Sequence, residues 1–414
     1  MSTARDSLPL DATVEPATQE EVVAEVRRAH ASATPLYPIG GGTALDFGLP
    51  ARERGLGLVL TGLNRVVDYP AGDMTITVES GITMSALAAE LAREGQRLPV
   101  DAARAEQATL GGLIATNFSG LRRYGYGTIR DYVIGISAVD GRGTPFKGGG
   151  RVVKNVAGYD FCKLLTGSLG TLAVITQVTL KVRPLAEASA FLNCTAASWS
   201  QAETLLAALV TSRTTPAAIE LLSGPYWQSE PMTAANDGAA ARLLVGFEGS
   251  ESEVRWQCEQ LGREWRALDV KGIREQDDAD AQRLWGLLTE FPSEPAALVL
   301  KANLPPSAVT GFMELLLQID ANVALQAHAG NGIVIARFAG FASNDAGRIL
   351  VQRLQPAAVR SGGNVVVWSC SAGELTRQAV WGAASADAAI MREVKRQFDP
   401  KGLLNPGRFV YGSA

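Results

Sequence analysis

Residues 38–43 have the sequence Pro-Ile-Gly-Gly-Gly-Thr, and the apolar stretch that leads into them, residues 35–39, predicts a short strand. Because glycine has no Cβ, three consecutive glycines let successive backbone N–H groups point into one concavity, and such a concavity binds anionic oxygens. The hydroxyl group of Thr43 adds one more donor. The loop therefore suits a diphosphate, although a flexible turn is an equally good interpretation of these residues alone.

This glycine loop differs from the two commonest nucleotide-binding loops. It does not have the spacing G-x-G-x-x-G followed by a helix, which marks a dinucleotide-binding Rossmann fold. No Gly-Lys-Ser/Thr sequence follows it, so it is not a P-loop. Residues 148–151, Gly-Gly-Gly-Arg, lack both contexts as well, and on their own they predict a hairpin turn.

Two further segments carry glycines beside polar residues. Residues 109–117, Thr-Leu-Gly-Gly-Leu-Ile-Ala-Thr-Asn, would let a planar ring approach the backbone, although such a stretch alone is more often a tight helix start. Residues 154–160, Lys-Asn-Val-Ala-Gly-Tyr-Asp, lead to Gly-Ser-Leu-Gly-Thr at 167–171 and then to a predicted strand. Taken alone, Tyr159 is best interpreted as a core aromatic residue with a satisfied hydroxyl.

In this order, the three motifs resemble the vanillyl-alcohol-oxidase/PCMH-type FAD-binding family. Residues 398–408, Phe-Asp-Pro-Lys-Gly-Leu-Leu-Asn-Pro-Gly-Arg, resemble the ending of FAD-linked oxidases of that group. The ordered set is specific and spans essentially the whole chain, although each motif alone is weak. The resemblance implies an α+β fold, with a PCMH-type FAD-binding domain of two α+β subdomains over residues 1–186 and a smaller α+β FAD-linked-oxidase C-terminal domain over residues 187–414.

The resemblance also implies FAD as the cofactor and assigns residues to it. The diphosphate would be held through backbone N–H groups of Ile39, Gly40, Gly41, Gly42 and Thr43. The diphosphate and flavin would be lined by Thr109, Gly111, Gly112, Thr116 and Asn117. The adenosine or the ring edge would lie near Gly170, Val174 and Ile175. Some relatives attach FAD covalently through a histidine beside the first loop; no histidine occupies residues 38–48, so we expect non-covalent binding.

The second half of the chain departs from several 2-hydroxy-acid dehydrogenases of the group. They carry H-x-G-D-G-N-x-H, whose histidines help bind a metal that holds the substrate, whereas residues 328–335 here are His-Ala-Gly-Asn-Gly-Ile-Val-Ile. Asn331 replaces the aspartate and Ile335 the second histidine, and because a divalent metal needs imidazole and carboxylate ligands, we predict no metal site. His328 is then a relic at a turn or a general base.

No catalytic residue is assigned from the sequence. Oxidation of a hydroxy acid needs a base for the hydroxyl proton and a cation for the carboxylate. The candidate cations are Arg337, Arg392 and Arg408, and for each of them a surface or structural role is the likelier interpretation on chemistry alone.

Residues 122–127, Arg-Arg-Tyr-Gly-Tyr-Gly, and residues 154–160 are similar to the FAD-binding subunits of bacterial glycolate oxidases. This similarity implies an FAD-dependent oxidoreductase in a hetero-oligomeric complex that converts glycolate, a small 2-hydroxy acid, to glyoxylate. A sister FAD-linked oxidase subunit would oxidise the substrate, and an iron–sulfur subunit would take the electrons onward. Two alternatives stay open: a self-sufficient FAD-dependent dehydrogenase of the D-lactate type, and a non-catalytic assembly subunit that keeps the flavin fold.

The composition fits a cytoplasmic protein of two domains. The 414 residues are 47% hydrophobic and 19% charged, with a net charge of −4 and no polybasic run, which argues against nucleic acid as the partner. The four cysteines form no C-x-x-C pair, so we expect free thiols and no iron–sulfur cluster in this chain. No signal peptide or transmembrane segment is predicted, and attachment to the inner face of the cell membrane through partners stays open.

The periodicity of apolar residues and the capping residues predict the regular elements. Helices are expected at residues 19–31, 84–94, 198–212, 250–265, 306–319 and 346–354. Strands are expected at residues 35–39, 57–60, 75–79, 132–139, 171–182, 219–222, 242–247, 297–304, 323–327, 333–338 and 364–369.

Overall fold

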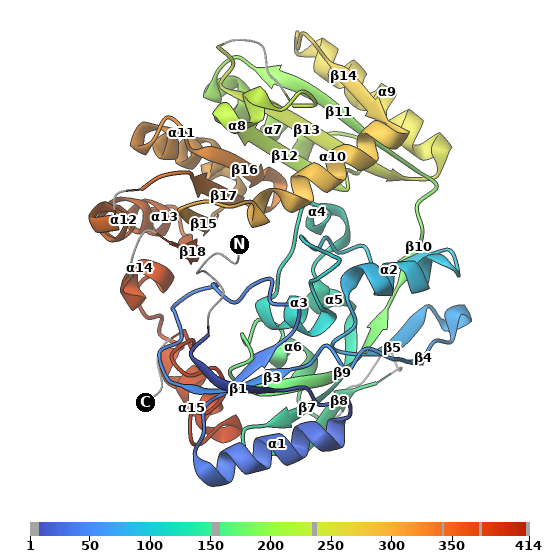
Figure 1. Cartoon of the computed structure of the whole chain (residues 1–414). Helices are drawn as coiled ribbons and strands as arrows, with labels where there is room; N and C mark the ends of the chain where they lie inside the picture. The colour runs from blue at the N-terminus through green and yellow to red at the C-terminus, as the bar shows by residue number, and fades with distance from the viewer. Residues whose placement is uncertain (1–7, 151–157, 234–237, 342, 372–374, 411–414) are drawn as a thin grey trace. The chain divides into compact units, whose positions relative to one another are not determined.

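The computed structural model describes residues 8–150, 158–233, 238–341, 343–371 and 375–410 (Figure 1). The chain forms two compact units. Unit 1 comprises Met1–Ser119, Gly127–Leu185 and Ala383–Ala414, and unit 2 comprises Gly120–Tyr126 and Ala186–Gly382. The chain thus passes from unit 1 to unit 2 beside the expected domain boundary, while the domain limits themselves stay a prediction.

Unit 1 contains two main sheets. Its five-stranded antiparallel sheet has the order β4-β5-β9-β7-β8 and is made of Val66–Asp68, Thr75–Glu79, Ala173–Lys181, Val133–Asp140 and Pro145–Gly149. Its three-stranded parallel sheet has the order β1-β3-β2 and is made of Leu10–Val14, Gly55–Val59 and Leu36–Ile39. A short ladder pairs β6 (Gln96–Arg97) with β10 (Arg183–Pro184).

The helices of unit 1 cover these sheets. They are α1 (Gln19–Ser32), η1 (Ala71–Asp73), α2 (Met84–Ala92), α3 (Leu110–Thr116), α5 (Ile129–Tyr132), α6 (Phe161–Leu165) and α15 (Ala388–Phe398). Helix α1 begins where Thr18 accepts a hydrogen bond from the N–H of Glu21, as its capping-box sequence predicts. Its buried face places Val22 and Val26 in one apolar cluster with Val174 of β9, so α1 packs onto the strand that follows the third motif.

Unit 2 is built on one eight-stranded antiparallel sheet. The strand order is β14-β11-β13-β12-β16-β17-β15-β18. In that order the strands are Arg274–Asp277, Ala188–Ala196, Ala241–Gly249, Ala218–Ser223, Ala324–His328, Ile333–Phe338, Leu298–Asn303 and Asn364–Cys370.

The helical segments of unit 2 are α4 (Arg123–Tyr126), α7 (Trp199–Val210), α8 (Pro225–Ser229), α9 (Glu251–Ala267), α10 (Asp278–Glu290), η2 (Phe291–Ser293), η3 (Pro306–Ala308), α11 (Val309–Ile319), η4 (Ala329–Asn331), α12 (Ser343–Ile349), η5 (Leu350–Leu354), α13 (Gln355–Arg360) and α14 (Arg377–Trp381).

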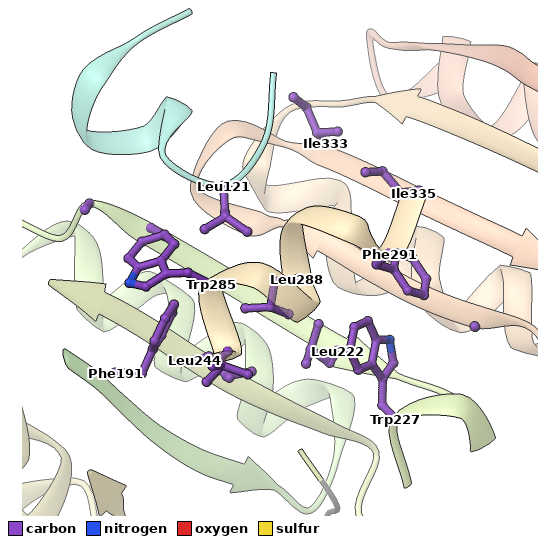
Figure 2. Packing of buried hydrophobic residues seen from close by; sticks show 14 of the residues in the cluster. Leu121, Phe191, Leu222, Trp227, Leu244, Trp285, Leu288, Phe291, Ile333 and Ile335 are labelled. Carbon is purple, nitrogen blue, oxygen red and sulfur yellow. The ribbon is translucent and has the colours of Figure 1, made fainter. Parts of the chain in front are cut away.

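Aromatic side chains fill the core under α10: the ring centroids of Trp285 and Phe191 are 4.5 Å apart, and those of Phe291 and Trp227 are 4.8 Å apart (Figure 2). Ile335 belongs to the same buried cluster.

Most expected elements are present with ends shifted by a few residues, but two expectations need correction, and the long strand β11 is an addition to the expected elements. Gly148 and Gly149 end strand β8, and the hairpin turn lies earlier, where the Asp140 carboxylate accepts hydrogen bonds from the N–H groups of Arg142 and Thr144. Strand β11 was not expected, because its small and polar residues lack a clear period of two. The helix expected over residues 346–354 changes to a π-helical turn at Leu350–Leu354 and continues to Arg360.

Within the described ranges, no helix combines the length and the apolar character that crossing a membrane requires.

Candidate functional site

The glycine loop of unit 1 lies directly against the start of the second motif. A Cβ on Gly40 would stand 2.2 Å from Oγ1 of Thr109, and a Cβ on Gly41 would stand 1.6 Å from the carbonyl oxygen of Gln107. Both distances are far shorter than any Cβ contact, so only glycine allows this approach. The first two motifs, about 70 residues apart in the chain, therefore form one structure.

The N–H groups of this loop are available to a ligand. Among the described residues, no backbone hydrogen bond uses the N–H of Gly40, Gly41 or Gly42. The loop is half-buried, and it is fixed from outside, where the guanidinium of Arg104 donates to the carbonyl oxygen of Thr43. Unpaired, half-buried N–H groups on a fixed loop are what a diphosphate needs.

The second motif is a helix start, as its sequence suggests. Thr109 caps α3 by accepting a hydrogen bond from the N–H of Gly112, at 3.3 Å. Thr116 donates its hydroxyl proton to the carbonyl oxygen of Gly112, at 2.9 Å. Asn117 ends the helix in the left-handed conformation, with φ 50°, and its buried Oδ1 has no hydrogen-bond partner in the described part of the chain. Asn117 therefore offers an open acceptor at the end of α3.

Gly111 uses its N–H group within the protein, and its expected contact with the cofactor stays a prediction. Its N–H donates to the carbonyl oxygen of Ser80 at 2.7 Å, so this group is not open to a cofactor. A Cβ on Gly111 would lie 3.0 Å from both the Cβ and the carbonyl oxygen of Ser80. Glycine at this position thus allows α3 to approach the residue that follows β5.

The third motif joins the other end of α3. The N–H groups of Gly167 and Leu169 donate to the carbonyl oxygens of Ile114 and Ala115, at 2.9 and 2.8 Å. The buried hydroxyl of Ser168 has no partner among the residues described. Unit 1 thus brings all three loops together. Each loop has a polar group without a described partner: the N–H groups of the glycine loop, Oδ1 of Asn117 and the hydroxyl of Ser168.

The remaining residues of the third motif lie in different surroundings. Residues 154–157 lie outside the described residues, and Tyr159 is 86% exposed, so the interpretation of Tyr159 as a core aromatic is wrong. Val174 is fully buried in the core of unit 1, and the carbonyl oxygen of Ile175 accepts a hydrogen bond from Ser80. Any contact of Val174 or Ile175 with a cofactor would therefore use the backbone, and this stays a prediction.

The C-terminal motif fastens these loops. Asn405 donates from its side chain to the carbonyl oxygen of Leu169 at 2.7 Å and from its backbone to Leu36 at 2.9 Å. Arg408 donates to the carbonyl oxygens of Leu45 and Phe47, which follow the glycine loop. Burial lowers the pKa of the Arg408 guanidinium. Because its N–H groups bind backbone carbonyls, Arg408 has a structural role.

A buried ion pair supports the same end of unit 1. Nζ of Lys395 donates to the carbonyl oxygen of Thr171 at 2.6 Å and to the carboxylate of Asp399 at 2.5 Å. Asp399 also accepts the N–H groups of Leu403 and Leu404. Burial lowers the pKa of Lys395, and the charge of Asp399 opposes that effect.

Unit 2 contains a buried polar cluster on the sheet. Nδ1 of His328 lies 2.7 Å from Oε1 of Glu220, and the amide of Gln326 donates to the other carboxylate oxygen at 2.8 Å. All three residues are almost fully buried. With the proton on Nδ1 bound to Glu220, Nε2 of His328 is an acceptor, and it has no partner among the described residues. His328 can therefore accept a proton from a ligand.

The strand after His328 does not complete a metal site. Ile335 pairs with Gln326 of β16 on one side and with Lys301 of β15 on the other. In the described part of the chain, no three His, Cys, Asp or Glu side chains are grouped as metal ligands. The residues at this motif, an imidazole tied to Glu220, the amide of Asn331 and an isoleucine, do not fit the metal that the relatives' motif implies.

Two cations lie on the strands near this cluster. Arg337 is 8% exposed and stacks over the rings of Tyr226 and Phe291, and its Nε and Nη1 have no hydrogen-bond partner within the described residues. Lys301 is half-buried, 5.7 Å from the ring of Trp368. Burial, aided by the charge of Arg123, lowers the pKa of Lys301 from 10.5 to about 8. Sequence reasoning missed Lys301, whose signal is a single charge inside an apolar strand.

Comparison with known proteins agrees with this arrangement. Residues 10–149 match the family "FAD binding domain", and residues 185–409 match "FAD linked oxidases, C-terminal domain". The chain belongs to the FAD-linked oxidases. FAD is accordingly the cofactor, and the unsatisfied N–H groups of the glycine loop, with Asn117 and Ser168 beside it, fit such a group.

Three curated relatives show the range of the family. The chain is 30% identical to a D-2-hydroxyglutarate dehydrogenase of Xanthomonas citri pv. viticola, covering 95% of this chain and 88% of that protein. It is 28% identical to a D-lactate dehydrogenase of Archaeoglobus fulgidus, covering 96% and 90%. It is also 28% identical to glycolate oxidase subunit GlcE of Escherichia coli, covering 94% and 96%.

A solved structure confirms the fold. An alkyldihydroxyacetonephosphate synthase superposes with a TM-score of 0.69 over 95% of this chain and 75% of that chain, at 19% identity. The fold is therefore the two-domain FAD-binding fold expected from the motifs. The curated relatives place this FAD-linked oxidase among FAD-dependent oxidoreductases that include 2-hydroxy-acid dehydrogenases and oxidases.

Proposed function

We propose that this chain is the FAD-binding subunit of a hetero-oligomeric glycolate oxidase, which converts glycolate to glyoxylate. The observation that carries the proposal is the combination of two features: the three glycine-containing loops that unit 1 brings together, and a motif in unit 2 with Ile335 in the place of the second histidine. The similarity to GlcE over nearly the full length of both chains supports it.

The proposed partners are a sister FAD-linked oxidase subunit and an iron–sulfur subunit that takes the electrons onward. The complex would work in the cytoplasm or at the inner face of the cell membrane. Bound FAD supplies a hydride acceptor. In a chain that oxidises a 2-hydroxy acid by itself, the second candidate below, His328, held in one tautomer by Glu220, would accept the hydroxyl proton at Nε2.

A self-sufficient dehydrogenase of the D-lactate type is the second candidate. Its specific support is the His328–Glu220 pair, which is intact although the metal motif is not, and the similarity to a D-lactate dehydrogenase. A non-catalytic assembly subunit is the third candidate, and it would need neither the open N–H groups of the glycine loop nor the open Nε2 of His328.

An anaerobic visible spectrum of the purified chain, before and after glycolate is added, tests the proposal. We expect a flavin spectrum that stays oxidised with the chain alone and bleaches when the partner subunits are added. Bleaching of the isolated chain by glycolate or D-lactate would establish the self-sufficient dehydrogenase instead. A purified chain that carries no flavin and takes none up would establish the assembly subunit.

A further inference from the structure

The segment rich in arginine and tyrosine at residues 122–126 belongs to unit 2, although it comes from the first third of the chain. Leu121 before it is fully buried in the core of that unit. Arg122 donates to the carboxylate of Glu248 from Nε at 3.1 Å and from Nη2 at 2.8 Å, and its guanidinium lies 4.1 Å from the ring centroid of Trp285. These contacts fasten the segment to unit 2.

The ring of Tyr124 in this segment lies on the turn that follows His328. A Cβ on Gly330 would stand 2.4 Å from Cδ2 and from Cε2 of Tyr124. Gly330 does not have a positive φ, so the ring, and not the backbone conformation, requires glycine here. Next in the chain, Gly125 donates its N–H to the carbonyl oxygen of Ala217 at 3.0 Å. The backbone of Tyr124 is therefore fixed where its ring meets the turn.

The turn under this ring carries two open acceptors. Nε2 of His328 and Oδ1 of Asn331 are buried and have no partner among the residues described. Beyond Gly330, a backbone hydrogen bond holds the end of the turn, since the N–H of Leu304 donates to the carbonyl oxygen of Gly332 at 2.7 Å. At Gly330 itself the turn is covered by a side chain, the tyrosine ring.

We propose that Tyr124 is a positioning residue for His328: its ring holds the turn Ala329–Asn331 closed and so keeps Nε2 of His328 covered until a ligand reaches it. A covered acceptor binds a donor more strongly than an acceptor that water already occupies. The ring acts by its shape, because the hydroxyl of Tyr124 makes no hydrogen bond within the described residues. The class of ligand, a 2-hydroxy acid, rests on the functions proposed above, whereas the hold on the turn rests on contacts within unit 2.

The exposure of the ring makes this role testable in the folded chain. Tyr124 is 37% exposed, whereas His328 is 2% exposed. The ring is thus an outer cover of the turn and not a member of the core. A cover of this kind opens locally, without unfolding of the unit beneath it.

The rate at which diethyl pyrocarbonate modifies His328, followed by mass spectrometry of its peptide, measures how often the turn opens. The chain has two histidines, and the half-buried His30 of unit 1 is the internal reference. We expect Tyr124→Ala to raise the rate at His328 roughly tenfold or more relative to His30, because aromatic packing on the turn is lost. Tyr124→Phe keeps the ring and should leave the rate unchanged. Trp256→Ala, which removes another partly exposed aromatic ring of unit 2, is the matched control and should also leave it unchanged.

A second variant tests whether the ring acts through Gly330. Gly330→Ala alone should raise the rate at His328, because its Cβ pushes the ring off the turn. Added to Tyr124→Ala, it should raise the rate no further, since the ring that it displaces is absent.

Two results would overturn the proposal: an unchanged rate at His328 in a Tyr124→Ala chain that melts cooperatively, or effects of the two changes that simply multiply in the double variant. If Tyr124→Ala does not fold, Gly330→Ala decides, and an unchanged rate there overturns the proposal. Flavin content is measured on the same samples. A chain that shows the expected rates but never carries flavin would refute the proposed function and leave the role of Tyr124 standing. A flavin-loaded chain with unchanged rates would refute the role of Tyr124 alone.

Discussion

Replacement of Gly41 by alanine should displace the glycine loop, because the new Cβ clashes with a single backbone atom. The new Cβ would stand 1.6 Å from the carbonyl oxygen of Gln107, and a contact of at least 3.0 Å is required, so the loop must move by about 1.4 Å. Neither atom of the clash can rotate away, because both belong to the backbone or are fixed to it. An N–H group displaced by this amount no longer makes a hydrogen bond of normal length.

The expected loss can be calculated from the donors on the loop. A hydrogen bond from N–H to a charged phosphate oxygen contributes about 1.5–3 kcal/mol. Loss of one such bond weakens FAD binding roughly 10- to 150-fold, and loss of two weakens it about 100-fold or more. The apo fold should suffer less, since no backbone hydrogen bond of the described chain uses the N–H of Gly40, Gly41 or Gly42.

Titration of FAD into the apo chain, followed by flavin fluorescence, measures this loss. Gly42→Ala is the matched control: among the described residues its Cβ meets Leu45, at 3.8 Å, although its φ of +72° should cost about 1–2 kcal/mol. Gly72→Ala, whose Cβ has no described neighbour within 4 Å, should behave like the unaltered chain. If Gly41→Ala melts normally without FAD and still binds FAD with unchanged affinity, the loop does not hold the cofactor.

Three more outcomes are expected. Lys395→Met leaves the Asp399 carboxylate buried without its cation, and chemical denaturation should show a loss of about 3–5 kcal/mol, part of which Asp399→Asn in the same chain restores. If the isolated chain reduces its own flavin with a 2-hydroxy acid, as the second candidate function requires, His328→Gln should slow that reduction about 100-fold or more, and an unchanged rate would exclude His328 as the base. Acid precipitation should release the yellow colour into the supernatant, since residues 38–48 contain no histidine, and colour retained in the pellet would show a covalent link.

The glycine motifs show how far sequence reasoning reaches. Their order resembles that of one family, and this resemblance identified the family and the cofactor although each motif alone is weak. The sequence does not predict which neighbouring residue requires each glycine. Gly41 is required by the carbonyl oxygen of Gln107 and Gly111 by Ser80, and such partners are known only once the chain is folded. Capping residues such as Thr18 and Ser250 were easier, because their partners lie three residues away.

The cationic residues of unit 2 show what sequence reasoning could not predict. Arg337 was a candidate from the sequence because arginine binds carboxylates, yet it stacks over two aromatic rings. Lys301 was not a candidate, since the apolar residues around it indicate only a buried strand. Its place opposite Ile335 depends on the register between β15 and β17, which are separated by a helix and another strand. Sequence periodicity predicts strands but not which residues pair across them.

Lys301 and Ile335 are best understood as one joint feature of the sheet. Directly opposed residues have Cβ atoms about 5 Å apart, and a dication at that distance from an ammonium group is opposed by about 7 kcal/mol at an effective dielectric constant of about 20. A second metal-binding histidine at position 335 would therefore conflict with a charged lysine at position 301. Isoleucine at position 335 removes a metal ligand and lysine at position 301 adds a positive charge, so both positions disfavour a divalent metal ion at this part of the sheet.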